Sequence, residues 1–263
     1  MPSGENDIYQ SKTIRAVKNM NKLLLNIEIE GLKDKVFVAG FHGIGSVGWI
    51  TVNFLVEKLK AKRIGIIITE KMPSFVSRKG GYILTPYEFY LSDNFIFLKC
   101  NMPIVPETSE NVLTKVIDFI EKGVIKEAFL VGGLDSRLKK EGDNRVRFVH
   151  TENLTEDLKK KLSKRENMVY LDEGLYIVGP LATLLTYFEA YRVPAVTVLP
   201  YARVDRPDPE AALEAAKVFA YIYGLELDYS DLIEQAAEIE KYLSEVQKKL
   251  EEMKERESRL IYI

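Results

Sequence analysis

Val36-Phe-Val-Ala-Gly-Phe-His-Gly-Ile-Gly-Ser-Val-Gly-Trp49 is the stretch that decides the fold. Its first four residues form a short apolar run, which is typical of a fully buried strand. The glycines that follow indicate positive φ angles or backbone that lies close to another segment; they are Gly40, Gly43, Gly45 and Gly48. From Ser46 the apolar residues recur with a helical period, and a β-rich run follows at residues 64–69. This order predicts the βαβ unit of a parallel sheet.

The same glycines have two interpretations. Gly43-Ile-Gly-Ser-Val-Gly48 matches the G-x-G-x-x-G fingerprint of dinucleotide-binding proteins, and Glu70 follows about 20 residues later. In such sites the glycines admit a pyrophosphate and the acid holds a ribose hydroxyl. The alternative is structural, with the glycines shaping a tight turn and packing the helix against the sheet. Phe41 and His42 lengthen the turn before the fingerprint. We therefore favour a structural glycine turn and expect no bound dinucleotide.

Composition limits the classes of protein that this chain can belong to. Its 263 residues are 46% hydrophobic and 29% charged, enough for one large α/β domain or two small ones. A net charge of −2 gives no electrostatic reason to expect nucleic acid. The single cysteine excludes an intramolecular disulfide and suits a reducing compartment. No apolar run approaches the roughly 20 residues of a membrane span, and no signal peptide pattern opens the chain. We expect a cytoplasmic protein without a membrane contact.

Strands alternate with helices along most of the chain. The expected strands are at residues 23–29, 36–39, 64–69, 94–100, 127–133, 145–150, 168–171 and 194–199, with a short hairpin at 82–90. The expected helices are at residues 46–59, 108–122, 154–162, 179–188 and 208–223. The pattern predicts a three-layer α/β sandwich with a mainly parallel central sheet. We divide the chain into a polar lead-in at 1–22, an α/β core domain at 23–224 and a C-terminal helical extension at 225–263.

Catalytic candidates are few. Ser46 is a weak nucleophile candidate, because Ile44 occupies a position where G-x-S-x-G requires glycine. His42 and His150 are the only histidines, and neither has metal-ligand spacing with another ligand. Cys100, at a strand end, fits a small buried hydrophobe better than a nucleophile. No triad, acid–base pair or metal cluster emerges, so we expect no catalytic residue, no metal and no cofactor.

Each of two charged segments has both a functional and a structural interpretation. Asp135-Ser-Arg137 follows a strand and two glycines, where α/β enzymes often place active groups. A solvated loop explains that segment equally well. Asp205-Arg-Pro-Asp208 indicates a rigid turn that caps the next helix, with a protein interface as the alternative.

A second C-terminal helix begins near Ser230. Its apolar residues follow a heptad seam of alternating four- and three-residue steps, namely Leu232, Ala236, Ile239, Leu243, Val246, Leu250 and Met253. The seam fits an amphipathic helix lying on its own domain, or a helix that pairs with another helix in an oligomer. After a highly charged end, the chain finishes with the apolar residues Leu260-Ile-Tyr-Ile263.

Several of these stretches together resemble the proteasome-assembly-chaperone family, and in particular its archaeal members. They are Gly40-Phe-His-Gly-Ile-Gly-Ser-Val-Gly48, the Leu84-Thr-Pro86 region, Val131-Gly-Gly133 and Leu199-Pro-Tyr-Ala-Arg-Val-Asp-Arg-Pro-Asp-Pro209. The resemblance covers about residues 23–225. It implies an α/β core similar to nucleoside phosphorylases but without their activity. It also implies a homo-oligomer, expected to be a tetramer, with extended C-terminal segments.

The resemblance also implies a role for the chain end. The segments of these archaeal members end in a hydrophobic–tyrosine–any-residue motif that docks on the proteasome core particle, and Ile261, Tyr262 and Ile263 match it. We therefore expect an ATP-independent chaperone or activator that binds the α subunits of the 20S core particle. The sequence contains no Walker-type G-x-x-x-x-G-K-[ST] motif, in agreement with this expectation. The alternative is an enzyme that binds a dinucleotide or nucleoside at Gly43–Gly48.

Overall fold

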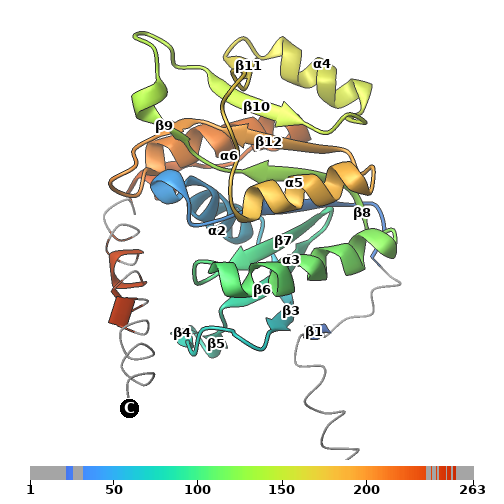
Figure 1. Ribbon diagram of the computed structural model, residues 1–263, viewed down its shortest axis with the longest axis vertical. Helices are drawn as coiled ribbons and strands as arrows, with labels where there is room; N and C mark the ends of the chain where they lie inside the picture. Colours follow the sequence, from blue (N-terminus) through green and yellow to red (C-terminus); the bar gives the residue numbers. More distant parts are fainter. Residues whose placement is uncertain are drawn as a thin grey trace, which may run out of the picture.

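The computed structural model describes residues 22–25, 32–234, 238, 241, 243–246, 248–249 and 251–252. Figure 1 shows one large sheet with helices on both of its faces. Within the described residues the sheet has nine strands in the order β1-β3-β6-β7-β2-β8-β12-β10-β11. Their bounds are β1 Lys22–Leu25, β2 Lys35–Gly40, β3 Lys62–Ile68, β6 Tyr87–Ser92, β7 Phe95–Cys100, β8 Ile125–Val131, β10 Val146–His150, β11 Met168–Tyr170 and β12 Ala195–Leu199.

The centre of this sheet is parallel. Strands β7, β2, β8 and β12 run in one direction, and β2 pairs with β7 on one side and β8 on the other. Antiparallel pairs lie on both sides of the centre, at β1–β3, β3–β6, β6–β7 and β10–β12, and the last strand β11 is parallel to β10. The predicted parallel sheet is therefore the core of a mixed one.

The prediction of a βαβ unit needs a correction. Strand β2, helix α2 (Val47–Lys58) and strand β3 do follow one another in the chain. However, β6 and β7 lie between β2 and β3 in the sheet, and β3 pairs with β1 and β6 in antiparallel fashion. Every residue of β7 is buried, whereas β3 has exposed residues at both ends. The more apolar strand takes the central place because it buries both of its faces there.

The hairpin expected at residues 82–90 is also wrong. Strand β5 (Tyr82–Leu84) pairs with β4 (Ser77–Lys79) in a separate small sheet, and β6 joins the main sheet. The buried carboxylate of Glu88 accepts hydrogen bonds from the backbone N–H and the hydroxyl of Thr85 at 2.9 and 3.0 Å. These bonds hold the chain in a bend between the two strands, so they do not pair with each other.

Helices cover both faces of the sheet, which confirms the three-layer sandwich. One core cluster joins the sheet to α2, α4 (Glu156–Lys164) and α6 (Pro209–Tyr223). A second cluster, on the opposite face, joins it to α3 (Pro106–Glu121) and α5 (Pro180–Ala190). Figure 1 shows α3 and α5 side by side over the strands. The remaining elements are α7 (Ser230–Glu234), the 3₁₀ turns η2 (Ile44–Ser46) and η3 (Ser136–Leu138), and the small sheet of β9 (Leu134–Asp135) with β13 (Tyr201–Ala202).

Helix boundaries follow local signals in the sequence. Asp208 caps α6, Pro209 occupies its first position and Gly224 ends it in the left-handed conformation. Helix α3 begins at Pro106 rather than at residue 108. Proline is well suited to the first helical position, because the N–H that it lacks would have no hydrogen-bond partner within the helix there. None of the helices among the described residues has the length and hydropathy needed to cross a membrane. Residues 1–21 and 26–31 lie outside the described residues.

Candidate functional site

The glycine turn joins strand β2 to helix α2 by direct backbone packing. A Cβ atom at Gly48 would lie 2.4 Å from the carbonyl oxygen of Val131 and 2.6 Å from the backbone nitrogen of Phe41. A Cβ atom at Gly40 would lie 2.5 Å from the Cα of Gly48. Real Cβ atoms do not occur at these distances, so both positions require glycine for the helix to approach the ends of β2 and β8.

The middle of the turn has a different character. Gly45 has a φ of 58°, and a Cβ atom there would lie 2.9 Å from the Cβ of Ala202. Ser46 also adopts the left-handed conformation, with a φ of 49°, and its side chain makes no capping hydrogen bond to α2. Gly43, in contrast, is exposed and has nothing within 4 Å of its Cβ position. Three of the four predicted structural glycines therefore have steric reasons, and Gly43 has none.

The loop after β12 closes over the glycine turn. The backbone N–H of Asp208 donates to the carbonyl oxygen of Gly45 at 2.8 Å. The Asp208 carboxylate accepts from the N–H of Ala211, which caps α6, and from the N–H of Arg203, both at 3.0 Å. The predicted turn that caps the next helix is thus confirmed. Its additional contact with Gly45 holds residues 203–208 against the start of α2.

The other stretches that carry the family resemblance converge on the same region. Gly133 follows β8, and a Cβ atom there would lie 2.4 Å from the carbonyl oxygen of Ile44. The hydroxyl of Tyr87, next to Pro86, donates to the carbonyl oxygen of Pro103 at 3.3 Å. Motifs that are far apart in the sequence therefore support one site at the carboxyl end of the parallel strands.

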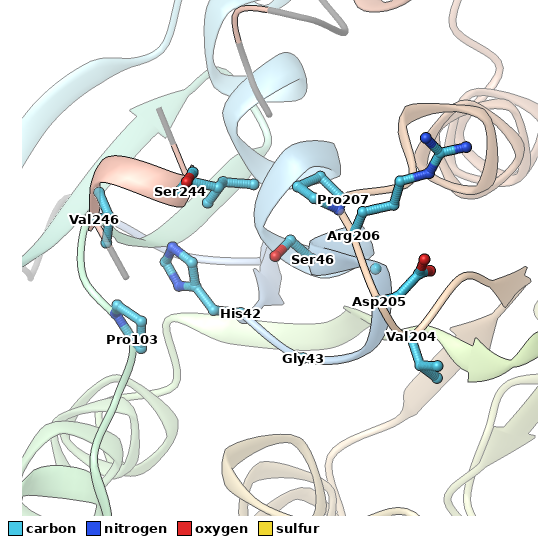
Figure 2. A pocket seen from close by; sticks show the side chains of 12 residues that line it. His42, Gly43, Ser46, Pro103, Val204, Asp205, Arg206, Pro207, Ser244 and Val246 are labelled. Atoms are coloured by element: carbon cyan, nitrogen blue, oxygen red, sulfur yellow. The ribbon is translucent and has the colours of Figure 1, made fainter. Parts of the chain in front are cut away.

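A cavity of about 460 Å³ lies at this site. It is lined by His42, Gly43, Gly45, Ser46, Pro103, Val204, Asp205, Arg206, Pro207, Leu243, Ser244 and Val246. Figure 2 shows these side chains coming from the glycine turn, the segment after β7, the 203–208 loop and the C-terminal helix. The sequence signals had identified the glycine turn and the loop, but nothing in the local sequence marked Pro103 or joined residues 243–246 to the cavity.

His42 is the most unusual group in the cavity. Both of its ring nitrogens are buried and have no hydrogen-bond partner within the described part of the chain. Its ring packs on Trp49, with a distance of 5.2 Å between the ring centroids. Burial lowers the pKa of His42 from 6.5 to about 3, because the charged form loses its hydration. His42 is therefore neutral at physiological pH.

Charge at the cavity comes from Asp205 and Arg206, which have opposite signs and exposed side chains. Figure 2 shows their charged ends pointing away from His42. Ser46 shares the cavity with His42, but the unpartnered histidine nitrogens make no hydrogen bond to its hydroxyl. A serine nucleophile needs such a bond to its base. This arrangement favours binding over covalent catalysis.

The two halves of the dinucleotide fingerprint do not meet. Glu70 follows β3, and β3 lies three strand positions away from β2. At roughly 4.8 Å per strand the separation across the sheet is about 14 Å. In a dinucleotide site the acid follows the strand next to the glycine turn. The geometry therefore supports the structural interpretation of the glycine turn.

The remaining catalytic candidates are either paired with a neighbouring group or buried. Arg137 donates from its backbone and its guanidinium to Asp135, so this exposed segment pairs with itself. His150 contacts the hydroxyl of Tyr170 at 3.0 Å. Cys100 is buried, and burial raises the pKa of its thiol. In the described part of the chain, no group of three or more histidine, cysteine and carboxylate side chains could hold a metal ion.

Part of the predicted seam can be located. Leu232, Leu243 and Val246 are 2%, 7% and 3% exposed, and all three are buried within the one chain. At these positions the arrangement agrees with a helix that lies on its own domain. The seam residues Ala236, Ile239, Leu250 and Met253, and the tail residues Ile261, Tyr262 and Ile263, lie outside the described residues. The helix-pairing and tail-docking hypotheses stay predictions.

Comparison with known proteins supplies the family context. A protein-family model, described as the PAC2 family, matches residues 37–247 of this chain. The fold is similar to that of Pyrococcus furiosus PbaA, an archaeal homolog of proteasome-assembly chaperone, with a TM-score of 0.76 and 23% identity over 89% of this chain and 100% of that chain. It is also similar to Pyrococcus furiosus PbaB, an archaeal proteasome activator, with a TM-score of 0.71 and 26% identity over 87% of this chain and 100% of that one. An uncharacterized protein of Methanocaldococcus jannaschii is 22% identical over an alignment of 237 residues, which covers 86% of this chain and 88% of that protein.

Proposed function

Because the chain belongs to the PAC2 family, we propose that it is a proteasome-binding chaperone or activator that docks its C-terminal tail on the 20S core particle without ATP. The observation that carries the proposal is the similarity to PbaB, an archaeal proteasome activator, which extends over the whole of that chain. The end of the sequence, Ile261-Tyr-Ile263, supplies the contact. The partners are the α subunits of the core particle, in the cytoplasm.

The chemistry of the tail suits a pocket between subunits. Full burial of Ile261 is worth about 1.5–3 kcal/mol. Tyr262 adds a large, stiff ring whose hydroxyl keeps a hydrogen bond when buried. The carboxylate of Ile263 is an anion that a lysine or backbone N–H groups bind, as in other cases of C-terminal recognition. The three residues thus combine apolar area, a directed hydrogen bond and a charge within a short segment.

Oligomerisation strengthens such a contact. One tail binds weakly, because ordering a flexible segment opposes binding. We propose a homo-oligomer, a tetramer, whose tails engage several pockets at once. Avidity then exceeds the affinity of one tail only if the C-terminal segments reach neighbouring pockets together. A helix adds about 1.5 Å of length per residue, so the distance that the tails can reach depends on how much of the C-terminal segment leaves the body.

The proposal does not include catalysis. His42, Ser46, Cys100 and His150 form no nucleophile–base pair in the described structure. A second candidate function is supported by the cavity at the glycine turn, because 460 Å³ lies within the size range of small-ligand sites. That candidate is an enzyme or binding protein for a nucleoside or dinucleotide. The separation of Glu70 from the turn makes it the weaker of the two.

Two variants test the tail. Tyr262→Ala removes the ring, and one extra residue after Ile263 moves the carboxylate out of place. Truncation of a central contact residue commonly weakens binding by 2 kcal/mol or more, which is about 30-fold for each tail. Binding to purified core particle and stimulation of peptide hydrolysis should therefore be lost in both variants.

A matched control distinguishes the tail from any exposed tyrosine. Tyr176 is 86% exposed on the α/β core, so Tyr176→Ala removes a comparable ring without touching the tail. This control should bind like the parent, and circular dichroism and solution mass should be unchanged in every variant. If Tyr262→Ala or the extended chain still binds and stimulates hydrolysis like the parent, the tail is not the contact and the proposed function is wrong.

A further inference from the structure

The C-terminal helix contacts the glycine turn through one face. Leu243 and Val246 are 7% and 3% exposed, whereas Ser244 and Glu245 between them are exposed. Residues three apart lie on the same side of a helix, so this pattern places one apolar face against the body. Leu243 belongs to the same core cluster as residues of α2 and α6. The contact is therefore a packed one.

His42 lies under this contact. It shares the cavity with Leu243, Ser244 and Val246, and Figure 2 shows Ser244 and Val246 on its side of the cavity. Both ring nitrogens are shielded from solvent without a hydrogen-bond partner in the described chain. Burying an unsatisfied polar group is unfavourable. If the helix moved away, the cavity would open on that side and the ring nitrogens of His42 would be exposed to water.

We propose that the glycine turn is the docking surface of the chain's own C-terminal helix, and that protonation of His42 releases this helix from the body. The inference deepens the proposed function, because the helix leads to the tail at residues 261–263, but it concerns a contact within one chain. The seated helix places the start of the tail segment at the glycine turn. Release would free the chain beyond Leu232, which is itself packed in the core cluster.

The direction of the pH effect follows from linkage. With the helix seated, the pKa of His42 is lowered to about 3 by burial. With the helix released, the ring meets water and returns toward its ordinary pKa of about 6.5. His42 then binds a proton in the released state that it does not bind in the seated state. The seated state is fully favoured above pH 6.5 and loses its advantage as the pH falls below that value.

The size of the effect can be worked out from the same two values. Relative to its value well above pH 6.5, the equilibrium constant for seating falls about 11-fold at pH 5.5 and about 100-fold at pH 4.5. The charged groups of the cavity are Asp205 and Arg206, which are exposed, of opposite sign and directed away from the ring. Glu245 of the helix is exposed on its outer face. The pH dependence of helix seating is therefore assigned to His42.

The intrinsic tryptophan fluorescence of the protein can report the protonation of His42. Trp49 is the single tryptophan, and its ring lies 5.2 Å from that of His42. A protonated imidazole beside an indole quenches its fluorescence, so Trp49 emission reports the charge of His42. Emission would be measured from pH 8 to pH 4 in the full chain, in the double variant Leu243→Ser/Val246→Ser and in Glu245→Gln. The serines unseat the helix without adding a charge, and Glu245→Gln is the matched control on its outer face.

The double variant should show quenching with a midpoint near pH 6.5, and adding His42→Asn should abolish it. The parent and Glu245→Gln should show a midpoint at least one pH unit lower. Equal midpoints in the parent and the double variant would overturn the proposal, because His42 would then be unaffected by the helix. Circular dichroism at pH 8 checks that every variant is folded.

Release of the helix is measured separately. Cys100 is buried, so a nitroxide reacts selectively with Glu245→Cys on the outer face of the helix. The label should be immobilised at pH 8 and become mobile over the pH range in which Trp49 is quenched. Quenching without a change in label mobility would overturn release. Neither experiment contains core particle, so their failure is distinct from failure of the proposed function.

Discussion

Gly48→Ala tests the structural role of the glycine turn most directly. The new Cβ would lie 2.4 Å from the Val131 carbonyl oxygen, 2.6 Å from the Phe41 nitrogen and 2.8 Å from the Gly40 Cα, and all three are backbone atoms. Overpacking typically lowers stability by about 1–3 kcal/mol, and rigid neighbours place this site at the upper end. The higher helix propensity of alanine returns about 1 kcal/mol. We expect a net loss of about 2 kcal/mol in the free energy of unfolding.

Urea denaturation followed by circular dichroism measures this loss, and thermal unfolding should show a melting temperature about 4–8 °C lower. Gly43→Ala is the matched control within the same turn. Its φ is −120° and nothing lies within 4 Å of its Cβ position, so alanine fits without strain. It should be neutral or more stable by up to about 1 kcal/mol, because alanine reduces the entropy of the unfolded chain. If both variants unfold within 0.5 kcal/mol of each other, about the error of such comparisons, the steric argument is wrong.

Three further predictions concern the cap, the ligand and the assembly. Asp208→Ala should destabilise the protein by about 1–2 kcal/mol in urea, because α6 loses its cap, whereas Asp208→Asn keeps an acceptor and should lose much less; equal losses would contradict the capping role. Calorimetric titration with NAD, NADP and FAD should show no binding, because Glu70 lies three strand positions from the glycine turn, and micromolar binding by any of them would refute this. Light scattering should give the mass of a tetramer, and a monomer alone would exclude the proposed avidity.

Local features of the fold could be predicted from the sequence because they depend on neighbouring residues. The apolar run after Lys35, the glycines and the helical period from Ser46 correctly predicted a buried strand, a turn and a helix. Asp208 and Pro209 correctly predicted the start of α6. These signals act through backbone conformation and capping within a few residues, so a single sequence contains them. The alternation of such elements was enough to predict the layered α/β class.

Features that depend on distant residues needed the tertiary structure. The sequence placed β3 in a βαβ unit with β2, but the fully buried β7 competes better for the central position, and local pattern cannot rank two apolar strands. The distinction between Gly48 and Gly43 depends on whether Val131, 83 residues from Gly48, lies against the turn. The cavity that contains His42 is also lined by Leu243 and Val246, two hundred residues further along the chain. Packing brings these groups together, and no local spacing records which of them will meet.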